Sequence, residues 1–169
     1  MTAAPPSFDS QAFKHALGRF PTGVTIVTAQ SGDDLVGLTV SSFNSVSLDP
    51  PLVVWSLKCN SHSLTAFEQC ERYVIQVLAA DQQSLAKRFA SGTSSDRFAG
   101  QAMVRCPGGS PRLDEPTAAW FECYNRDRYV QGDHIVLIGQ VEHCEHHLRP
   151  PLIYHGGGFD LTPTVGALT

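Results

Sequence analysis

The chain has 169 residues, 42% of them hydrophobic and 17% charged, which predicts a single folded domain and excludes a disordered chain. Its net charge of −4 argues against a general nucleic-acid-binding protein, because such a protein carries a basic face. No apolar run approaches the about 18 residues that a membrane helix needs, so neither nucleic acid nor a membrane is an expected partner.

The chain begins with a short helix in this interpretation. Ser7 or Asp9 is the candidate N-cap, and apolar residues between 13 and 20 recur at helical spacing on one face. Pro21 is expected to end the helix, since proline cannot continue it.

Alternating or β-branched apolar residues predict six strands, at residues 24–29, 35–43, 52–57, 73–79, 118–124 and 134–141. A turn at 31–34 joins the first two strands into a hairpin. Asp49-Pro50-Pro51 interrupts the chain before the third strand, because neither proline can donate to a sheet ladder.

Two more helices are predicted between these strands. One is capped by Ser61 or Ser63 and runs to Phe67, and the other is capped by Asp81 and runs through Phe89. Residues 92–116 are expected to be loop-rich.

The order of these elements favours a mainly β fold. Strands follow one another through turns and short helices without a regular βαβ alternation, which indicates an antiparallel sheet, closed as a barrel, with peripheral helices. Neither of the common glycine-rich nucleotide-binding motifs occurs. We expect a mobile segment over residues 1–11, one domain over 12–160 and a C-terminal tail over 161–169.

The five cysteines are odd in number, widely spaced and without a Cys-x-x-Cys pair. A disulfide scaffold or a four-thiolate zinc site is therefore not expected. The first ten residues also lack the basic start and apolar stretch of a secretory signal. Together these features predict a reducing, cytoplasmic location.

Several polar groups leave two interpretations open. The hydroxyls of residues 39–47 suit a phosphate or a polar ring edge, and equally suit a solvated strand face. Gly132-Asp133-His134 is either a structural turn or part of a site, and residues 154–159 form either a close-approach loop for a planar ligand or a flexible tail. The cluster at residues 143–147 reads as an exposed charged hairpin, so no functional metal site is expected.

Taken together, the motifs resemble the flavin reductase-like family, the reductase components of two-component flavin monooxygenases. The most specific segment is T-x-S-S-F-x-S-V-S-x-D-P-P at residues 39–51. The other matching stretches follow in the same order as in the family, at residues 18–24, 60–64, 85–90, 97–100, 122–123, 132–134 and 151–159.

The resemblance implies an antiparallel split β-barrel of the flavin-binding type, acting as a homodimer. It implies an NAD(P)H:flavin oxidoreductase that transfers a hydride to N5 of FAD or FMN, with NADH or NADPH as co-substrate, and supplies reduced flavin to a partner monooxygenase. Two alternatives stay open: a non-catalytic flavin-binding or delivery protein, and a split-barrel FMN oxidase with its own organic substrate.

The resemblance also implies roles for individual residues, all at positions read from this sequence. His134 would position the nicotinamide as the catalytic residue. Phe89 would pack either on the ligand or in the core. The flavin-binding residues would come from four segments. They are the hydroxyl-rich strand end (Thr39, Val40, Ser41 and Ser42), the neighbouring strand end (Leu57 and Lys58), the helix start suited to a phosphate (Asn60, Ser61 and Ser63) and the following helix (Lys87, Arg88 and Phe89). The segment closing the nicotinamide side would contribute Tyr154, His155, Gly156, Gly157 and Phe159.

Two features depart from the family pattern. Residues 92–116 match it poorly, and Gln76 stands where an asparagine is expected. Both departures affect the expected preference for NADH or NADPH more than the expected reaction.

Overall fold

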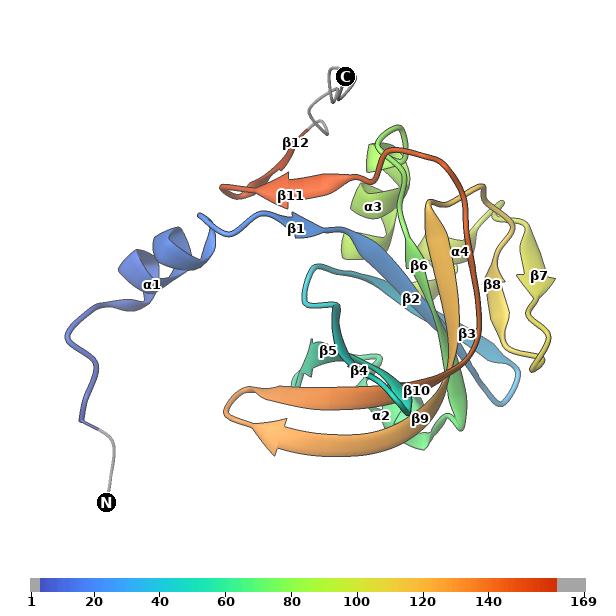
Figure 1. The fold of residues 1–169 in the computed structure, drawn as a ribbon, viewed down its shortest axis with the longest axis horizontal. Helices are drawn as coiled ribbons and strands as arrows, with labels where there is room; N and C mark the ends of the chain where they lie inside the picture. The colour runs from blue at the N-terminus through green and yellow to red at the C-terminus, as the bar shows by residue number, and fades with distance from the viewer. Residues whose placement is uncertain (1–3, 161–169) are drawn as a thin grey trace.

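The computed structural model describes residues 4–160, which form a mainly β fold with four short helices (Figure 1). The helices are α1 (Ser10–Leu17), α2 (Leu64–Gln69), α3 (Gln83–Ala90) and α4 (Ser94–Phe98). The strands are β1 (Thr22–Gly23), β2 (Thr25–Ser31), β3 (Asp34–Val40), β4 (Asn44–Leu48), β5 (Pro51–Lys58), β6 (Arg72–Val77), β7 (Met103–Arg105), β8 (Pro111–Leu113), β9 (Ala119–Gln131), β10 (His134–His146), β11 (Ile153–His155) and β12 (Gly158–Asp160). The expected tail at 161–169 and the first three residues of the expected N-terminal segment lie outside the described residues.

The main sheet has seven strands in the order β3-β2-β6-β9-β10-β5-β4, and every neighbouring pair is antiparallel. The predicted antiparallel, mainly β architecture is therefore confirmed. The predicted hairpin of β2 and β3 forms around Gly32, whose φ of 61° suits glycine at a tight turn. Strands β9 and β10 run well beyond the predicted ends, and their hairpin reaches past the other strands of the main sheet (Figure 1).

Apolar side chains on the two faces of the sheet fill two cores. Val27 and Ala29 of β2 face a core that contains Trp55 and Phe67, while Ile26 faces a second core beneath α3. Alternation along the strand produces this split, because successive side chains point to opposite faces. The indole of Trp55 is fully buried and meets the ring of Phe67 edge-on at 5.1 Å, an arrangement worth about 0.5–1.5 kcal/mol beyond the buried area.

Capping differs between the helices. The carboxylate of Asp9 accepts a hydrogen bond from the backbone N–H of Ala12 at 2.7 Å and caps α1, as predicted. The predicted Asp81 cap of α3 is wrong, because the cap position is occupied by Gln82. Asp81 instead pairs with Arg149 at 2.6 Å.

The segment at 92–116 is more ordered than its loop-like sequence suggests. It contains α4, which starts with a capping box between Thr93 and Asp96, and the β7–β8 hairpin. The buried amide of Gln76 donates to the carbonyl of Leu113 at 3.0 Å and accepts from its N–H at 2.8 Å. Gln76 thereby ties the short strand β8 to the main sheet.

A buried carboxylate holds the other end of this hairpin. Glu122 of β9 accepts hydrogen bonds from the N–H groups of Gly108 at 2.7 Å and Ser110 at 2.9 Å. Burial raises the pKa of Glu122, but the hydrogen bonds from Ser110 and Gly108 outweigh it and hold the pKa below its ordinary value. The loop at 106–111 is thus held in place by a charged side chain from the core.

The segment after β10 forms a small second sheet, so the flexible-tail interpretation of residues 154–159 is wrong. β11 pairs with both β1 and β12, with Tyr154 opposite Thr22 and Phe159. The N–H of Gly156 also donates to the carbonyl of Gly18 at 2.9 Å. Long-range pairing of the strands, absent from local sequence signals, orders this segment.

Within residues 4–160, no helix is long and apolar enough to cross a membrane. In the same range, no group of three His, Cys, Asp or Glu side chains is placed to hold a metal ion.

Candidate functional site

A hollow of about 460 Å³ lies where β3 and β5 end, beside the end of α3 and the start of β10. Its volume falls within the usual range of ligand pockets, about 300–1,000 Å³. Its apolar wall consists of Leu38, Val40, Leu57, Phe89 and Ala90. Its polar wall consists of Thr39, Ser41, Ser42, Ser56, Lys58, Asn60, Ser61, Arg97 and His134. We call this hollow the central pocket.

The fold therefore gathers many of the residues singled out from the sequence. The central pocket contains Thr39, Val40, Ser41, Ser42, Leu57, Lys58, Asn60, Ser61, Phe89 and His134. Sequence reasoning gave no role to four further lining residues: Leu38, Ser56, Ala90 and Arg97. The sequence did contain a signal for Arg97 as a site residue, because it begins the R-F-A-G stretch at 97–100 that resembles the family pattern.

Two of the predicted hydroxyl groups at the end of β3, those of Thr39 and Ser42, are engaged by the protein itself. The Thr39 hydroxyl donates to the carbonyl of Ala86 at 2.7 Å and ties β3 to α3. The Ser42 hydroxyl accepts from the N–H of Ser56 at 2.9 Å and donates to its carbonyl at 3.3 Å. These bonds fix the end of β3 against α3 and β5, so the Thr39 and Ser42 hydroxyls serve first to hold the pocket lining.

Arg97 is the best-held cation of the central pocket. Its Nη1 donates to the carbonyl of Gly37 at 2.7 Å and its Nε donates to the carbonyl of Ser91 at 3.0 Å. Partial burial lowers the pKa of this guanidinium below its ordinary value, but arginine stays charged in proteins. A guanidinium has five N–H donors, so donors remain for an anionic ligand.

His134 lies at the opposite side of the polar wall, at the first position of β10 and opposite Lys58 of β5. Its Nδ1 is 2.7 Å from Oδ1 of Asp133. This hydrogen bond lowers the pKa of Asp133, which stays ionised and accepts from the imidazole. The pairing orients the ring and leaves Nε2 as the atom available to a ligand.

The lining of the central pocket has a charge pattern that favours an anion. It contains Lys58, Arg97 and His134, and no acidic side chain. The same lining contains five apolar residues, whose side chains suit the face of a planar ring. The pocket can therefore hold an amphipathic, planar ligand with an anionic tail, and none of the lining groups forms a nucleophile–base pair.

Two further hollows adjoin the central pocket. One, of about 550 Å³, shares Asn60, Ser61 and Arg97 with it and includes the predicted residue Ser63. The other, of about 910 Å³, shares Ser41 and Ser42. The predicted residues Tyr154, His155, Gly156 and Gly157 line this larger hollow, together with residues of α1.

The remaining predicted residues lie elsewhere. Phe89 is fully buried and meets Phe98 edge-on at 5.1 Å, so it serves the core while its edge lines the pocket. Phe159 packs on Tyr154 at 5.5 Å and joins the core beneath α3. Lys87 is exposed on α3.

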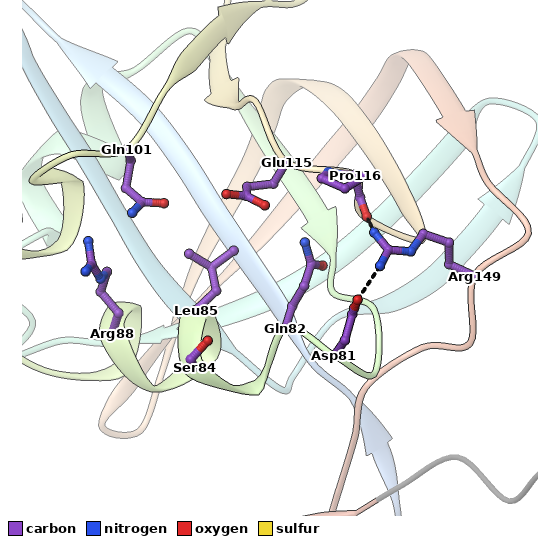
Figure 2. A pocket seen from close by; sticks show the side chains of 9 residues that line it. All are labelled: Asp81, Gln82, Ser84, Leu85, Arg88, Gln101, Glu115, Pro116 and Arg149. Atoms are coloured by element: carbon purple, nitrogen blue, oxygen red, sulfur yellow. Dashed lines mark hydrogen bonds and ion pairs between the residues drawn. The ribbon is translucent and has the colours of Figure 1, made fainter.

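Arg88 does not reach the central pocket. It lines a separate hollow of about 430 Å³ with Asp81, Glu115 and Arg149 (Figure 2), and its Nη1 donates to the carbonyl of Ala99 at 2.8 Å. The face of α3 that carries Arg88 is turned away from the face that carries Phe89, because neighbouring helix residues point about 100° apart. The structure thus places Arg97, and not Arg88, beside the hydroxyl-rich wall.

Comparison with known proteins gives consistent matches. Residues 17–162 match a family model described as flavin reductase like domain. The chain is 39% identical over 160 residues to the Agrobacterium fabrum protein named FMN reductase (NADH) SmoA, covering 92% of this chain and 87% of that protein. It is 37% identical over 155 residues to the Rhodococcus jostii protein named flavin-dependent monooxygenase, reductase subunit HsaB, covering 90% and 78%.

A solved structure agrees with these matches. The structure titled Streptomyces globisporus C-1027 NADH:FAD oxidoreductase SgcE6 in complex with NAD and FAD fragments superposes with a TM-score of 0.85 at 30% identity. The match covers 93% of this chain and 95% of that one.

Proposed function

Because the chain belongs to the flavin reductase-like family, we propose that it is an enzyme that reduces FMN or FAD with NADH and supplies the reduced flavin to a separate monooxygenase. The single observation that carries this function is the central pocket, in which ten of the eighteen residues that the resemblance assigned to the site meet. Relatives named as an NADH-dependent FMN reductase and as the reductase subunit of a monooxygenase support the activity and the partner.

The central pocket fits a flavin in shape and charge. Its apolar wall suits one face of an isoalloxazine ring, and the backbone and hydroxyls of residues 39–42 suit the polar edge of that ring. Arg97 suits the phosphate, since a guanidinium binds phosphate oxygens through two parallel N–H groups. No acidic residue lines the pocket, so nothing in its lining repels an anionic ligand.

The chemistry divides between cofactor and protein. A bound flavin supplies a hydride acceptor at N5, and the hydride comes from the nicotinamide of NADH. The protein holds the two rings at reacting distance, about 3–3.5 Å. Hydride transfer needs no general base at the reacting atoms, which agrees with the absence of a nucleophile–base pair among the lining residues.

We propose that His134 positions the dinucleotide. Its Nδ1 faces Asp133, so Nε2 is the atom that contacts the nicotinamide amide or a phosphate. The backbone of residues 39–42 stabilises the charge gained on reduction, because N–H dipoles held in place cost no reorganisation. Tyr154 and the glycines after it line the hollow beside Ser41 and Ser42, and close the dinucleotide side in this proposal.

The test of function is consumption of NADH by the purified protein with FMN or FAD in excess. Steady turnover that rises with flavin concentration supports a reductase. A protein that binds flavin but consumes no NADH is instead the non-catalytic carrier. A purified protein that retains FMN tightly, and turns over an organic substrate without added flavin, is the oxidase.

We also propose that the protein is a homodimer. Helix α1 buries none of its residues, and its apolar side chains Phe13 and Leu17 are 49% and 57% exposed. Phe20, which follows the helix, is 71% exposed. A second subunit covering this face would also close the hollow beside it. Light scattering that gives the monomer mass of 18.3 kDa at working concentration contradicts the proposal.

The split barrel and the cytoplasmic location stay proposals of the same kind. The edge strands β3 and β4 are joined by only three residues, and the Ser42 hydroxyl bridges that connection to β5, which supports a sheet curled into a barrel. All five cysteines, which lie within the described residues, are free thiols, which supports a reducing compartment.

A further inference from the structure

The hollow of about 430 Å³ drawn in Figure 2 is a second site of ligand size, apart from the central pocket. Its volume lies within the usual range of ligand pockets, about 300–1,000 Å³. It shares no lining residue with the central pocket or with the two hollows beside that pocket. We call it the outer pocket. A ligand bound here therefore occupies neither the proposed flavin site nor the proposed dinucleotide site.

Four charged side chains line the outer pocket, and only two of them pair with each other. Arg149 binds the carboxylate of Asp81 at 2.6 Å and also donates to the carbonyl of Pro116. Within residues 4–160, Arg88 donates one hydrogen bond, to a backbone carbonyl at 2.8 Å, and the Glu115 carboxylate has no partner. One guanidinium and one carboxylate thus remain available to a ligand.

A buried amide adds an unused donor to these two charges. Gln82, the cap residue of α3, is only 7% exposed, and its Oε1 accepts a hydrogen bond from the N–H of Ala79 at 2.8 Å. Its Nε2 has no hydrogen-bond partner in the described part of the chain, and Figure 2 shows it pointing into the outer pocket. Because buried amide groups are normally hydrogen-bonded, this donor indicates a place for a ligand oxygen.

An apolar surface lies between the available charges. The side chain of Leu85 is half-buried, and Figure 2 shows it between Arg88 and Glu115. A guanidinium binds a carboxylate through parallel N–H groups, and a carboxylate binds an ammonium group. A molecule that carries both charges and a short apolar part therefore matches the lining.

We propose that the outer pocket binds a free α-amino acid with an apolar side chain. Arg88 and the Gln82 amide bind its carboxylate, Glu115 accepts hydrogen bonds from its ammonium group, and Leu85 contacts its side chain. The inference goes beyond the proposed function, because it requires neither bound flavin nor hydride transfer.

The first experiment is calorimetric titration of the protein with L-leucine and with L-phenylalanine. We expect a dissociation constant below about 1 mM for at least one of them. The N-acetyl derivative of the same amino acid lacks the ammonium charge, and its amide derivative lacks the carboxylate. Each derivative should bind about tenfold more weakly or worse. Saturating FMN should leave the dissociation constant of the amino acid within about twofold, because the two sites are separate.

Variants then place the amino acid in the outer pocket. Glu115→Gln and Arg88→Gln each remove one charge, and each should raise the dissociation constant of the amino acid about tenfold or more. Gln82→Glu keeps the acceptor for the N–H of Ala79 but replaces the unused donor with an oxygen, so it should also weaken binding. Asp114→Asn is the matched control, because Asp114 is the exposed carboxylate beside Glu115 and lies outside the outer pocket lining. Thermal unfolding checks that each variant is folded.

Four results overturn the inference. Dissociation constants above about 1 mM for both amino acids show that the outer pocket is not their site. A derivative that binds as tightly as its parent shows that only one charge is recognised. Loss of binding in the presence of FMN places the amino acid in the central pocket. Unchanged binding in Glu115→Gln and Arg88→Gln, or an equal loss in Asp114→Asn, places it elsewhere. Each result is obtained without NADH, so the proposed function is tested separately.

Discussion

Removing the Arg97 guanidinium should weaken FMN binding through the phosphate. The side chain is held by hydrogen bonds to the carbonyls of Gly37 and Ser91, and it lines the central pocket. A hydrogen bond to a charged group contributes about 1.5–3 kcal/mol. Because about 1.4 kcal/mol changes a dissociation constant tenfold, Arg97→Ala should raise the FMN dissociation constant about 10-fold to 150-fold.

The assay is a fluorescence titration of FMN and of riboflavin, which lacks the phosphate, on the same protein preparation. Arg97→Ala should change riboflavin affinity little, while Arg97→Lys should fall between the two proteins for FMN, since lysine keeps the charge but not the planar fork. Thermal unfolding checks that loss of the two carbonyl contacts has not disturbed β3 and α4.

Arg88→Ala tests which arginine binds the flavin phosphate: Arg97, as the structure indicates, or Arg88, as the sequence suggested. Arg88 lines the hollow shown in Figure 2, so its removal should leave FMN affinity within twofold. If Arg88→Ala loses FMN and Arg97→Ala does not, the phosphate lies near α3 and our reasoning is refuted. Equal losses of FMN and riboflavin affinity in Arg97→Ala also refute the phosphate role. They would mean that Arg97 contacts the flavin ring or supports the fold.

Three further outcomes are expected. His134→Ala should raise the KM for NADH and leave flavin affinity unchanged, as steady-state kinetics and flavin titration can show; an unchanged KM and kcat would mean that His134 only shapes the turn. Glu122→Gln should lower the free energy of unfolding at neutral pH by about 1–3 kcal/mol, because a hydrogen bond to a charged group is lost. The Glu122 pKa is depressed in the folded state, so its contribution is present above 4.5 and is lost as pH falls through the lower folded-state pKa; urea titrations across this range should show that loss in the original protein and not in the variant. Gly139→Ala should cost about 1–3 kcal/mol of stability from overpacking, since the new methyl group would overlap the Tyr73 hydroxyl, and Tyr73→Phe in the same chain should recover part of the melting temperature.

Local patterns were sufficient for much of the fold. Runs of alternating or β-branched apolar residues predicted β2, β5 and β6, because such runs favour strands that pack into a core. The Asp9 cap and the turn at Gly32 were predicted for the same reason, since each depends on neighbours within a few residues.

Elements that depend on pairing with another strand, near or distant in the chain, were not predicted. Strand β4 is largely exposed and rich in serine, and it forms by pairing with the next strand, β5. β11 pairs with the distant strand β1, and β12 pairs with β11. The short strand β8 depends on the buried amide of Gln76, a residue that the sequence marked only as a departure from the family.

The candidate site divides in the same way. The sequence by itself determined that the motif segments belong together and named His134, Ser41, Ser42 and Lys58, all of which line the central pocket. Only the tertiary structure decided which cation stands beside them. Arg88 and Arg97 each precede a Phe-Ala pair in the sequence. Helix rotation turns Arg88 outward, while α4 brings Arg97 against Gly37 of β3. Residue type and order are properties of the chain, whereas the direction of a side chain is set by how helices pack on the sheet.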